Sequence, residues 1–222
     1  MWRIAAPMIL SNVSVPLLGM VDTAVMGHLE SPTYLGAVAI GGTIFTFLYI
    51  GMNFLRMGTT GIAAQRYGAE DNDGLRVALG QALIVSLAIA VVILLLQLPI
   101  GKIALALLGG DTETQSHAAT YFYIRVWSAP GTLANYVLIG WFLGLQNARV
   151  PLLIFLTINI TNILLDLLFV VGFGMKIEGV ALASVIAEYT ALCVAIGFAA
   201  RELRRHPGHW LLARLSRLSA YR

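Results

Sequence analysis

The chain has 222 residues and a formal net charge of +3, and 11% of its residues are charged, against about a quarter in ordinary soluble domains. Its mean hydropathy of +0.83 argues against a soluble fold and predicts an all-α membrane protein. One cysteine, Cys193, leaves no basis for a disulfide framework or a cysteine-rich metal site. Because it lies in an apolar run, we expect Cys193 to be buried.

A helix needs roughly 20 apolar residues to cross a hydrocarbon core of about 30 Å. Six runs satisfy this requirement and predict six membrane-spanning helices, at 4–26, 34–55, 77–98, 118–145, 150–173 and 179–200. Pro7, Pro16 and Asp22 interrupt the first run, so we interpret it as a retained span rather than a signal peptide. The chain then divides into a membrane domain, 1–200, and a basic cytoplasmic segment, 201–222. That segment is either a linker to further spans or a helix on the inner membrane surface.

Basic residues are distributed unevenly between the two sides of these spans. Eleven of the 14 lie on one side: Arg3, Arg56, Arg66, Arg76, Arg149, Arg201, Arg204, Arg205, Arg214, Arg217 and Arg222. The other side has Lys102, Lys176 and Arg125, and we expect Arg125 to lie near the outer interface. Positively charged segments stay in the cytoplasm, so both termini are predicted to be cytoplasmic. This pattern explains the positive charge without a nucleic-acid partner.

Three acidic residues, Asp22, Asp166 and Glu188, lie inside predicted spans. A carboxylate in the bilayer costs at least a few kcal/mol, so such residues usually face a cavity and mark an ion or proton route. At about 1.5 Å per residue, Asp22 lies roughly 27 Å and Asp166 roughly 24 Å from the cytoplasmic start of their spans. One cavity in the outer half of the membrane can therefore hold both carboxylates.

Polar neighbours accompany these acids. Asn159, Asn162 and Asp166 stand at i, i+3 and i+7 and form one helical stripe, while Ser184 and Glu188 lie one turn apart. A cavity that opens and closes around such groups can load and release a proton, and the same oxygen ligands suit Na⁺. The sequence leaves the two ions open. It also leaves open a membrane scaffold that transports nothing, in which these groups only link helices by hydrogen bonds.

Prolines in the spans predict bends, because each removes a helical hydrogen bond. Pro7 and Pro16 are expected to bend the first span, and Pro130 with Gly131 the fourth. No metalloprotease motif, nucleophile elbow or phosphate-binding loop occurs in the sequence. All four histidines fall outside the spans. We therefore predict no enzyme activity, no metal site and no cofactor besides a coupling ion.

Four segments resemble, in order and spacing, the signatures of the multidrug and toxic compound extrusion (MATE) family: 21–28 (VDTAVMGH), 60–69 (TGIAAQRYGA), 162–166 (NILLD) and 179–184 (GVALAS). Residues 31–32 (SP), Arg125 and residues 186–189 (IAEY) further resemble its DinF subgroup. One segment departs from the family pattern. Residues 144–151 (GLQNARVP) lack the usual Gly-x-Thr-Arg, although Arg149 and Pro151 remain.

The resemblance implies a bacterial inner-membrane transporter of twelve helices in two lobes, of which this chain covers the amino-terminal one. It implies export of drugs, commonly organic cations, in exchange for H⁺ or Na⁺. The residues that it assigns to cation coupling are Asp22, Asn162 and Asp166. Ser184 stands where the family commonly has a Thr and is added to this set, Asn135 matches a further polar site residue, and Pro7 matches a bending proline. Asn135, together with Asn159 and Glu188 from the polar faces described above, is a secondary candidate. Alternating access requires two lobes, so the chain is expected to be a fragment or to pair with a separate half. A lipid-linked precursor flippase of the same superfamily, with a basic cavity, stays an alternative.

Overall fold

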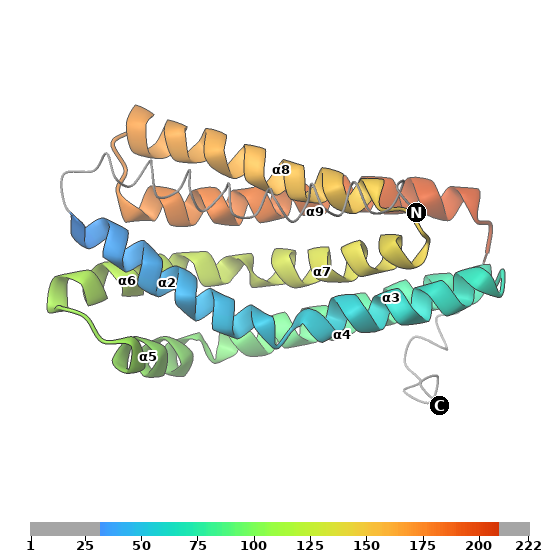
Figure 1. Cartoon of the computed structure of the whole chain (residues 1–222), viewed down its shortest axis with the longest axis horizontal. Coiled ribbons are helices and arrows are strands. Elements are labelled where there is room, and N and C mark those ends of the chain that lie inside the picture. Colours follow the sequence, from blue (N-terminus) through green and yellow to red (C-terminus); the bar gives the residue numbers. More distant parts are fainter. Residues whose placement is uncertain (1–31, 209–222) are drawn as a thin grey trace.

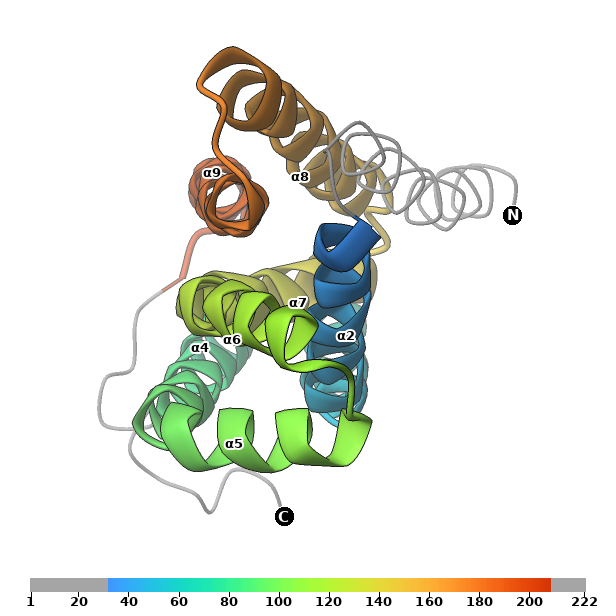
Figure 2. The ribbon, with the colours of Figure 1, turned by 90° about the vertical axis from the view of Figure 1, so that its left-hand side faces the viewer.

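A computed structural model describes residues 32–208 of the chain. Residues 1–31 and 209–222 lie outside the described part, and with them the predicted first span, including Pro7, Pro16 and Asp22, and most of the predicted basic segment. The described residues form helices that lie side by side along one long axis, with α5 as the exception (Figures 1 and 2). No strand occurs between residues 32 and 208.

The described helices follow one another with short connections. They are α2 (Pro32–Ile50), α3 (Asn53–Gly68), α4 (Asn72–Leu95), α5 (Gln97–Leu108), α6 (Thr112–Arg125), the 3₁₀ turn η1 (Val126–Ser128), α7 (Ala129–Gly144), α8 (Arg149–Asp166), the π-helical segment η2 (Leu167–Gly172) and α9 (Ile177–Arg205). Within residues 32–208, four stretches are long and apolar enough to cross a membrane: Thr33–Gly68, Asn72–Leu95, Arg149–Gly172 and Ile177–Arg205. Each of these stretches overlaps one predicted span. The division of the chain into a membrane domain, 1–200, and a basic segment, 201–222, stays a prediction.

The predicted fourth span, 118–145, is not one continuous α-helix. It consists of the end of α6, the turn η1 and α7, and Pro130 lies in the first turn of α7. A proline fits there because the first amide groups of a helix have no partner within it. The break therefore comes immediately before the Pro130-Gly131 pair that predicted a bend.

Between α4 and α6 the chain forms a short helix that runs across the end of the bundle. Figure 2 shows α5 lying at a steep angle to the other helices. Gly109 and Gly110 then return the chain to α6 with φ values of 67° and 120°, which residues with a side chain rarely adopt. Ile103 and Leu107 remain exposed on α5, as expected of an apolar helix at a membrane surface.

Large apolar side chains cover much of the outer surface of the bundle. Phe47 is 72% exposed and Leu95 is 76% exposed, which fits helices surrounded by lipid rather than water. The buried face of α9 carries a small residue at every fourth position: Ala183, Ala187, Ala191, Ala195 and Ala199. Such a stripe lets neighbouring helices approach closely. Cys193 lies off this stripe and is exposed, so its expected burial is wrong, because an apolar residue on a membrane helix can face lipid instead of the core.

The end of α3, the start of α4, the start of α8 and the end of α9 share one end of the bundle (Figure 1). Most of the described arginines that predict the cytoplasmic side are therefore together, whereas Arg56 lies in the first turn of α3. Arg76 is buried and its Nη2 donates hydrogen bonds to the carbonyl oxygens of Leu203 and His206. Carbonyls at a helix C-terminus lack partners within the helix. Arg76 thus attaches the end of α9 to α4.

At the opposite end, Asp111 caps α6. Its carboxylate accepts hydrogen bonds from the amides of Glu113 and Thr114 and, at 2.6 Å, from the Thr114 hydroxyl. The hydroxyl bond, followed by the amide bonds, lowers the pKa of Asp111 below its usual value.

Asp111→Ala is therefore expected to lower the melting temperature at pH 7, with the deficit shrinking as the pH falls through the lowered pKa of Asp111. A depressed pKa stabilises the fold above the unfolded-state pKa, and protonation removes that contribution. Melting curves of both proteins between pH 3 and 7 measure the difference. Asp111→Asn keeps an acceptor for the amide groups, so its deficit at pH 7 should be smaller than that of Asp111→Ala, and it should also shrink as wild-type Asp111 becomes protonated. A pH-independent deficit for Asp111→Ala would contradict this assignment.

Candidate functional site

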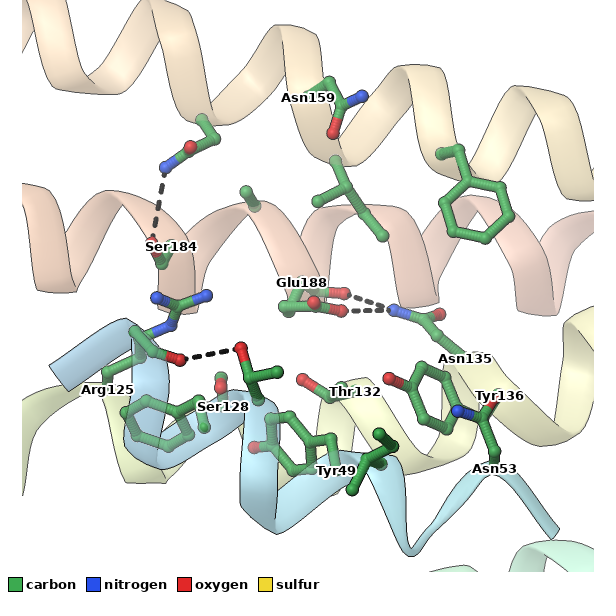
Figure 3. A pocket seen from close by; sticks show the side chains of 18 of the residues that line it. Tyr49, Asn53, Arg125, Ser128, Thr132, Asn135, Tyr136, Asn159, Ser184 and Glu188 are labelled. Atoms are coloured by element: carbon green, nitrogen blue, oxygen red, sulfur yellow. Dashed lines mark hydrogen bonds between the residues drawn. The ribbon is translucent and has the colours of Figure 1, made fainter. Parts of the chain in front are cut away.

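A cavity of about 660 Å³ lies between the α2, α6–α7, α8 and α9 helices (Figure 3). Its polar lining among the described residues consists of Thr43, Thr46, Tyr49, Asn53, Arg125, Ser128, Thr132, Asn135, Tyr136, Asn159, Asn162, Ser184 and Glu188. Helices drawn from most of the described chain thus converge on one space. The volume is in the range of sites that bind drug-sized molecules.

Glu188 of α9 is the acidic residue in the described wall of this cavity. Asn135 of α7 donates one hydrogen bond to Glu188 Oε2 at 2.9 Å and another to the Glu188 backbone carbonyl at 3.0 Å. Asn135 is itself 1% exposed. The pair links α7 to α9 and fixes the position of the carboxylate, so two secondary candidates from the sequence lie together.

Arg125 also lines the cavity, at the end of α6. Its guanidinium donates to the Tyr121 hydroxyl and lies 5.1 Å from the ring centre of Phe45 and 5.4 Å from that of Tyr121. The expected position of Arg125 near the outer interface stays a prediction. Ring and hydroxyl contacts hold the charge inside the bundle.

The predicted polar stripe on α8 faces inward along its whole length. Asn159 is 8% exposed, Asn162 2% and Asp166 0%. Asn162 Nδ2 lies 3.5 Å from Ser184 Oγ on α9, at the limit of a hydrogen bond. Asn162 and Ser184 are thus neighbours, as expected for two members of one site. Asn159 and Asn162 line the cavity, but Asp166 does not.

Asp166 occupies a different depth from Glu188. The α8 and α9 helices run in opposite directions (Figure 1), and Asn162 of α8 lies beside Ser184 of α9. Asp166 is four residues from Asn162 toward the α8–α9 connection, and Glu188 is four residues from Ser184 away from it. At 1.5 Å per residue, the two acids are about 12 Å apart along the bundle axis.

The backbone changes geometry immediately after Asp166. This residue ends the α-helical part of α8, and the π-helical segment η2 follows. Phe173 donates its amide to the Leu168 carbonyl, five residues earlier, at 3.0 Å. Widened turns of this kind often occur at functional sites. Asp166 is therefore a buried acid at a local irregularity of a membrane helix.

Comparison with known proteins identifies the family to which this arrangement belongs. A family model described as MatE matches residues 7–168. The chain belongs to the MatE family. It is 48% identical over 196 residues to DNA damage-inducible protein F of Escherichia coli, covering 88% of this chain and 43% of that protein. It is 28% identical over 199 residues to the probable multidrug resistance protein NorM of Bacillus subtilis, covering 87% of this chain and 43% of that protein.

Solved structures of the same family share the fold. A MATE structure in complex with MaD3S superimposes with a TM-score of 0.80 at 25% identity, covering 87% of this chain and 43% of the other. The MatE chain therefore spans less than half the length of the relatives that it matches. The expected family and the all-α membrane fold, corresponding to one half of a MATE transporter, are confirmed.

Several residues of the MatE cavity were not predicted from the sequence. Hydroxyl-bearing residues such as Thr46, Tyr49, Ser128 and Thr132 line it, yet serine and threonine are common in membrane helices for packing alone. Their spacing in the sequence could have indicated them. In the continuous spans that the sequence predicts, Thr46 and Asn53, seven residues apart, would share one helical face, as would Ser128, Thr132 and Asn135 at i, i+4 and i+7.

The remaining predicted site residues lie outside the described part. Asp22, with the bending prolines Pro7 and Pro16, falls in residues 1–31, so the pairing of Asp22 with Asp166 stays a prediction. Between residues 32 and 208, no group of three or more metal-binding side chains comes together.

Proposed function

We propose that this MatE chain forms one lobe of a secondary active transporter that exports drugs or other toxic organic compounds in exchange for H⁺ or Na⁺. The observation that carries the proposal is the burial of Asp166, which is 0% exposed on a membrane helix. The relatives support drugs as the substrate class, since one is named a probable multidrug resistance protein. The rest of the transporter, a second six-helix lobe, belongs to the same polypeptide or to a separate partner.

In this proposal Asp166 and Asp22 bind the driving ion, with Asn162 and Ser184 supporting the site. A buried carboxylate in the bilayer is costly unless it is used, and the amide and hydroxyl beside it supply neutral oxygen ligands. Both termini are cytoplasmic and the membrane is the bacterial plasma membrane. The gathering of Arg66, Arg76, Arg149 and Arg205 near one end of the bundle supports this orientation.

Asp22→Asn in the complete two-lobe transporter tests the proposal. We expect gradient-driven efflux of a cationic dye from proteoliposomes to fall at least about tenfold, because a lost charged ligand contributes 1.5–3 kcal/mol and 1.4 kcal/mol is a factor of ten. Separate pH and Na⁺ gradients identify the driving ion. Unchanged efflux together with unchanged ion binding would refute the proposal.

Arg125 favours a second candidate, a flippase for lipid-linked precursors, because such a carrier needs positive charge in its cavity for the phosphate groups of its cargo. The described cavity wall balances this arginine with Glu188, so it is not basic overall. Movement of an anionic lipid-linked sugar across proteoliposomes, lost in Arg125→Gln, would favour the flippase over the exporter.

A further inference from the structure

We propose that Glu188 is a substrate-binding carboxylate that receives the positive group of an organic monocation, at a site separate from the driving-ion site at Asp166. This inference rests on the proposed export function and names the substrate class of the cavity. It also assigns a different ligand to each acid, the organic cation to Glu188 and the driving ion to Asp166.

The carboxylate of Glu188 has a fixed position at the cavity wall. Asn135 Nδ2 is 2.9 Å from one carboxylate oxygen, and the same amide group is 3.0 Å from the Glu188 backbone carbonyl. Since one amide contacts both groups, rotation of the glutamate would break a contact with α7. A charge held in this way needs little reorganisation when a ligand arrives, which favours affinity.

Aromatic rings surround the same space. Tyr49 of α2 and Tyr136 of α7 line the cavity beside Glu188 (Figure 3), and Phe155 of α8 lines it as well. The electron-rich faces of such rings attract cations, and more strongly where water is excluded. A carboxylate together with several rings is therefore suited to an organic cation whose charge is spread over an apolar body.

The charged residues in the described wall fit a substrate with one positive group. Glu188 and Arg125 are the charged residues in the described lining. Arg125 contacts the Tyr121 hydroxyl and lies over the rings of Phe45 and Tyr121, on the α6 side. A second positive group would meet this guanidinium instead of a second acid. The described wall thus matches a single positive group directed toward α9.

The two acids do not share one ligand. Asp166 does not line the cavity, and it lies about 12 Å from Glu188 along the bundle axis. A cation bound at Glu188 and an ion bound at Asp166 therefore need not displace each other from one carboxylate. Coupling then acts through the equilibrium between two conformations of the transporter, each favoured by one of the two ligands.

Equilibrium binding to the purified two-lobe transporter tests this division. The probes are tetraphenylphosphonium, a monocation, and triphenylphosphine oxide, an uncharged relative of similar shape, both measured by titration calorimetry without an ion gradient. Glu188→Gln keeps an acceptor for Asn135 but removes the charge. We expect it to raise the Kd of tetraphenylphosphonium about tenfold or more and to leave that of triphenylphosphine oxide unchanged.

Two further variants control the experiment. Glu178→Gln removes an exposed acid from the first turn of the same helix, outside the cavity, and should leave both dissociation constants unchanged. Glu188→Asp keeps the charge but shortens the side chain, so it should bind tetraphenylphosphonium more tightly than Glu188→Gln does. Equal binding of the cation by wild type and Glu188→Gln, equal weakening for both probes, or tighter binding by Glu188→Gln than by Glu188→Asp would overturn the inference.

The proposed coupling site can fail separately. Asp22→Asn and Asp166→Asn are read out by gradient-driven flux, whereas Glu188→Gln is read out by binding at equilibrium. Loss of cation affinity in Glu188→Gln with full flux in the aspartate variants would leave the substrate site standing and refute the coupling site. The reverse pattern would refute the assignment of Glu188 alone.

Discussion

Asp166→Asn is expected to abolish ion-driven export by the complete transporter while leaving the lobe folded. Asparagine has the size of aspartate and retains an oxygen and an amide for hydrogen bonding. It cannot take up and release a proton, however, and it offers no negative charge to Na⁺. An ion can shift a conformational equilibrium only through its different affinity for the two states. Without the Asp166 carboxylate to bind the ion, flux under an imposed pH or Na⁺ gradient should fall at least about tenfold.

Thermal melting of the same variant separates a coupling site from a scaffold. Asp166 is completely buried, and a carboxylate kept in the membrane interior to bind an ion carries a desolvation cost that asparagine, of the same shape, does not. A coupling site therefore predicts a melting temperature at least equal to that of wild type, together with lost dependence on the driving ion. A scaffold predicts a clear loss of stability and no ion dependence in either protein. Glu178→Gln, exposed on α9, should change neither readout.

The polar stripe on α8 could be predicted because it is local. Asn159, Asn162 and Asp166 face the same way in any α-helix. The one polar face of an otherwise apolar membrane helix is expected to face the interior of the bundle and not the lipid. The closeness of Ser184 to Asn162 needed only the antiparallel hairpin of α8 and α9. Periodicity and short connections thus determine these contacts.

Contacts between distant segments could not be predicted in the same way. Asn135 and Glu188 are 53 residues apart, and nothing in either helix alone says that α7 and α9 turn these faces together. The contacts of Arg125 could not be predicted for a related reason. Its guanidinium contacts the Tyr121 hydroxyl and lies near the rings of Tyr121 and Phe45, and Phe45 belongs to a helix far from Arg125 in the sequence.

The ends of the helices could not be predicted from hydropathy alone. The predicted spans stop where apolar residues stop, at 55 and 200, whereas α3 continues to Gly68 and α9 to Arg205. Residues such as alanine, glutamine and arginine favour helix without being apolar, so a helix can extend beyond the hydrocarbon core. Hydropathy reports the thickness of the membrane and not the length of the helix.

Gly140→Leu is expected to prevent α3 and α7 from packing. A Cβ atom at Gly140 would lie 2.4 Å from the backbone carbonyl oxygen of Arg56, and one at Gly144 would lie 2.6 Å from the Ala63 side chain. The neighbour at Gly140 is backbone, which cannot rotate away as a side chain can. Even Gly140→Ala should therefore lower the free energy of unfolding by about 1–3 kcal/mol, and leucine by more.

Melting in detergent, followed by size-exclusion chromatography, measures this effect. Gly58→Ala is the matched control, because Gly58 is a glycine of α3 with no atom within 4 Å of an added Cβ, and it should melt like wild type or slightly higher. Equal melting temperatures for Gly140→Ala and Gly58→Ala would contradict the close helix contact. The contact matters for the cavity because α2–α3 and α7 carry adjoining parts of its wall, where Asn53 and Tyr136 lie next to each other (Figure 3). Separating α3 from α7 should therefore weaken binding of tetraphenylphosphonium at Glu188 as well, even though neither Gly140 nor Arg56 lines the cavity.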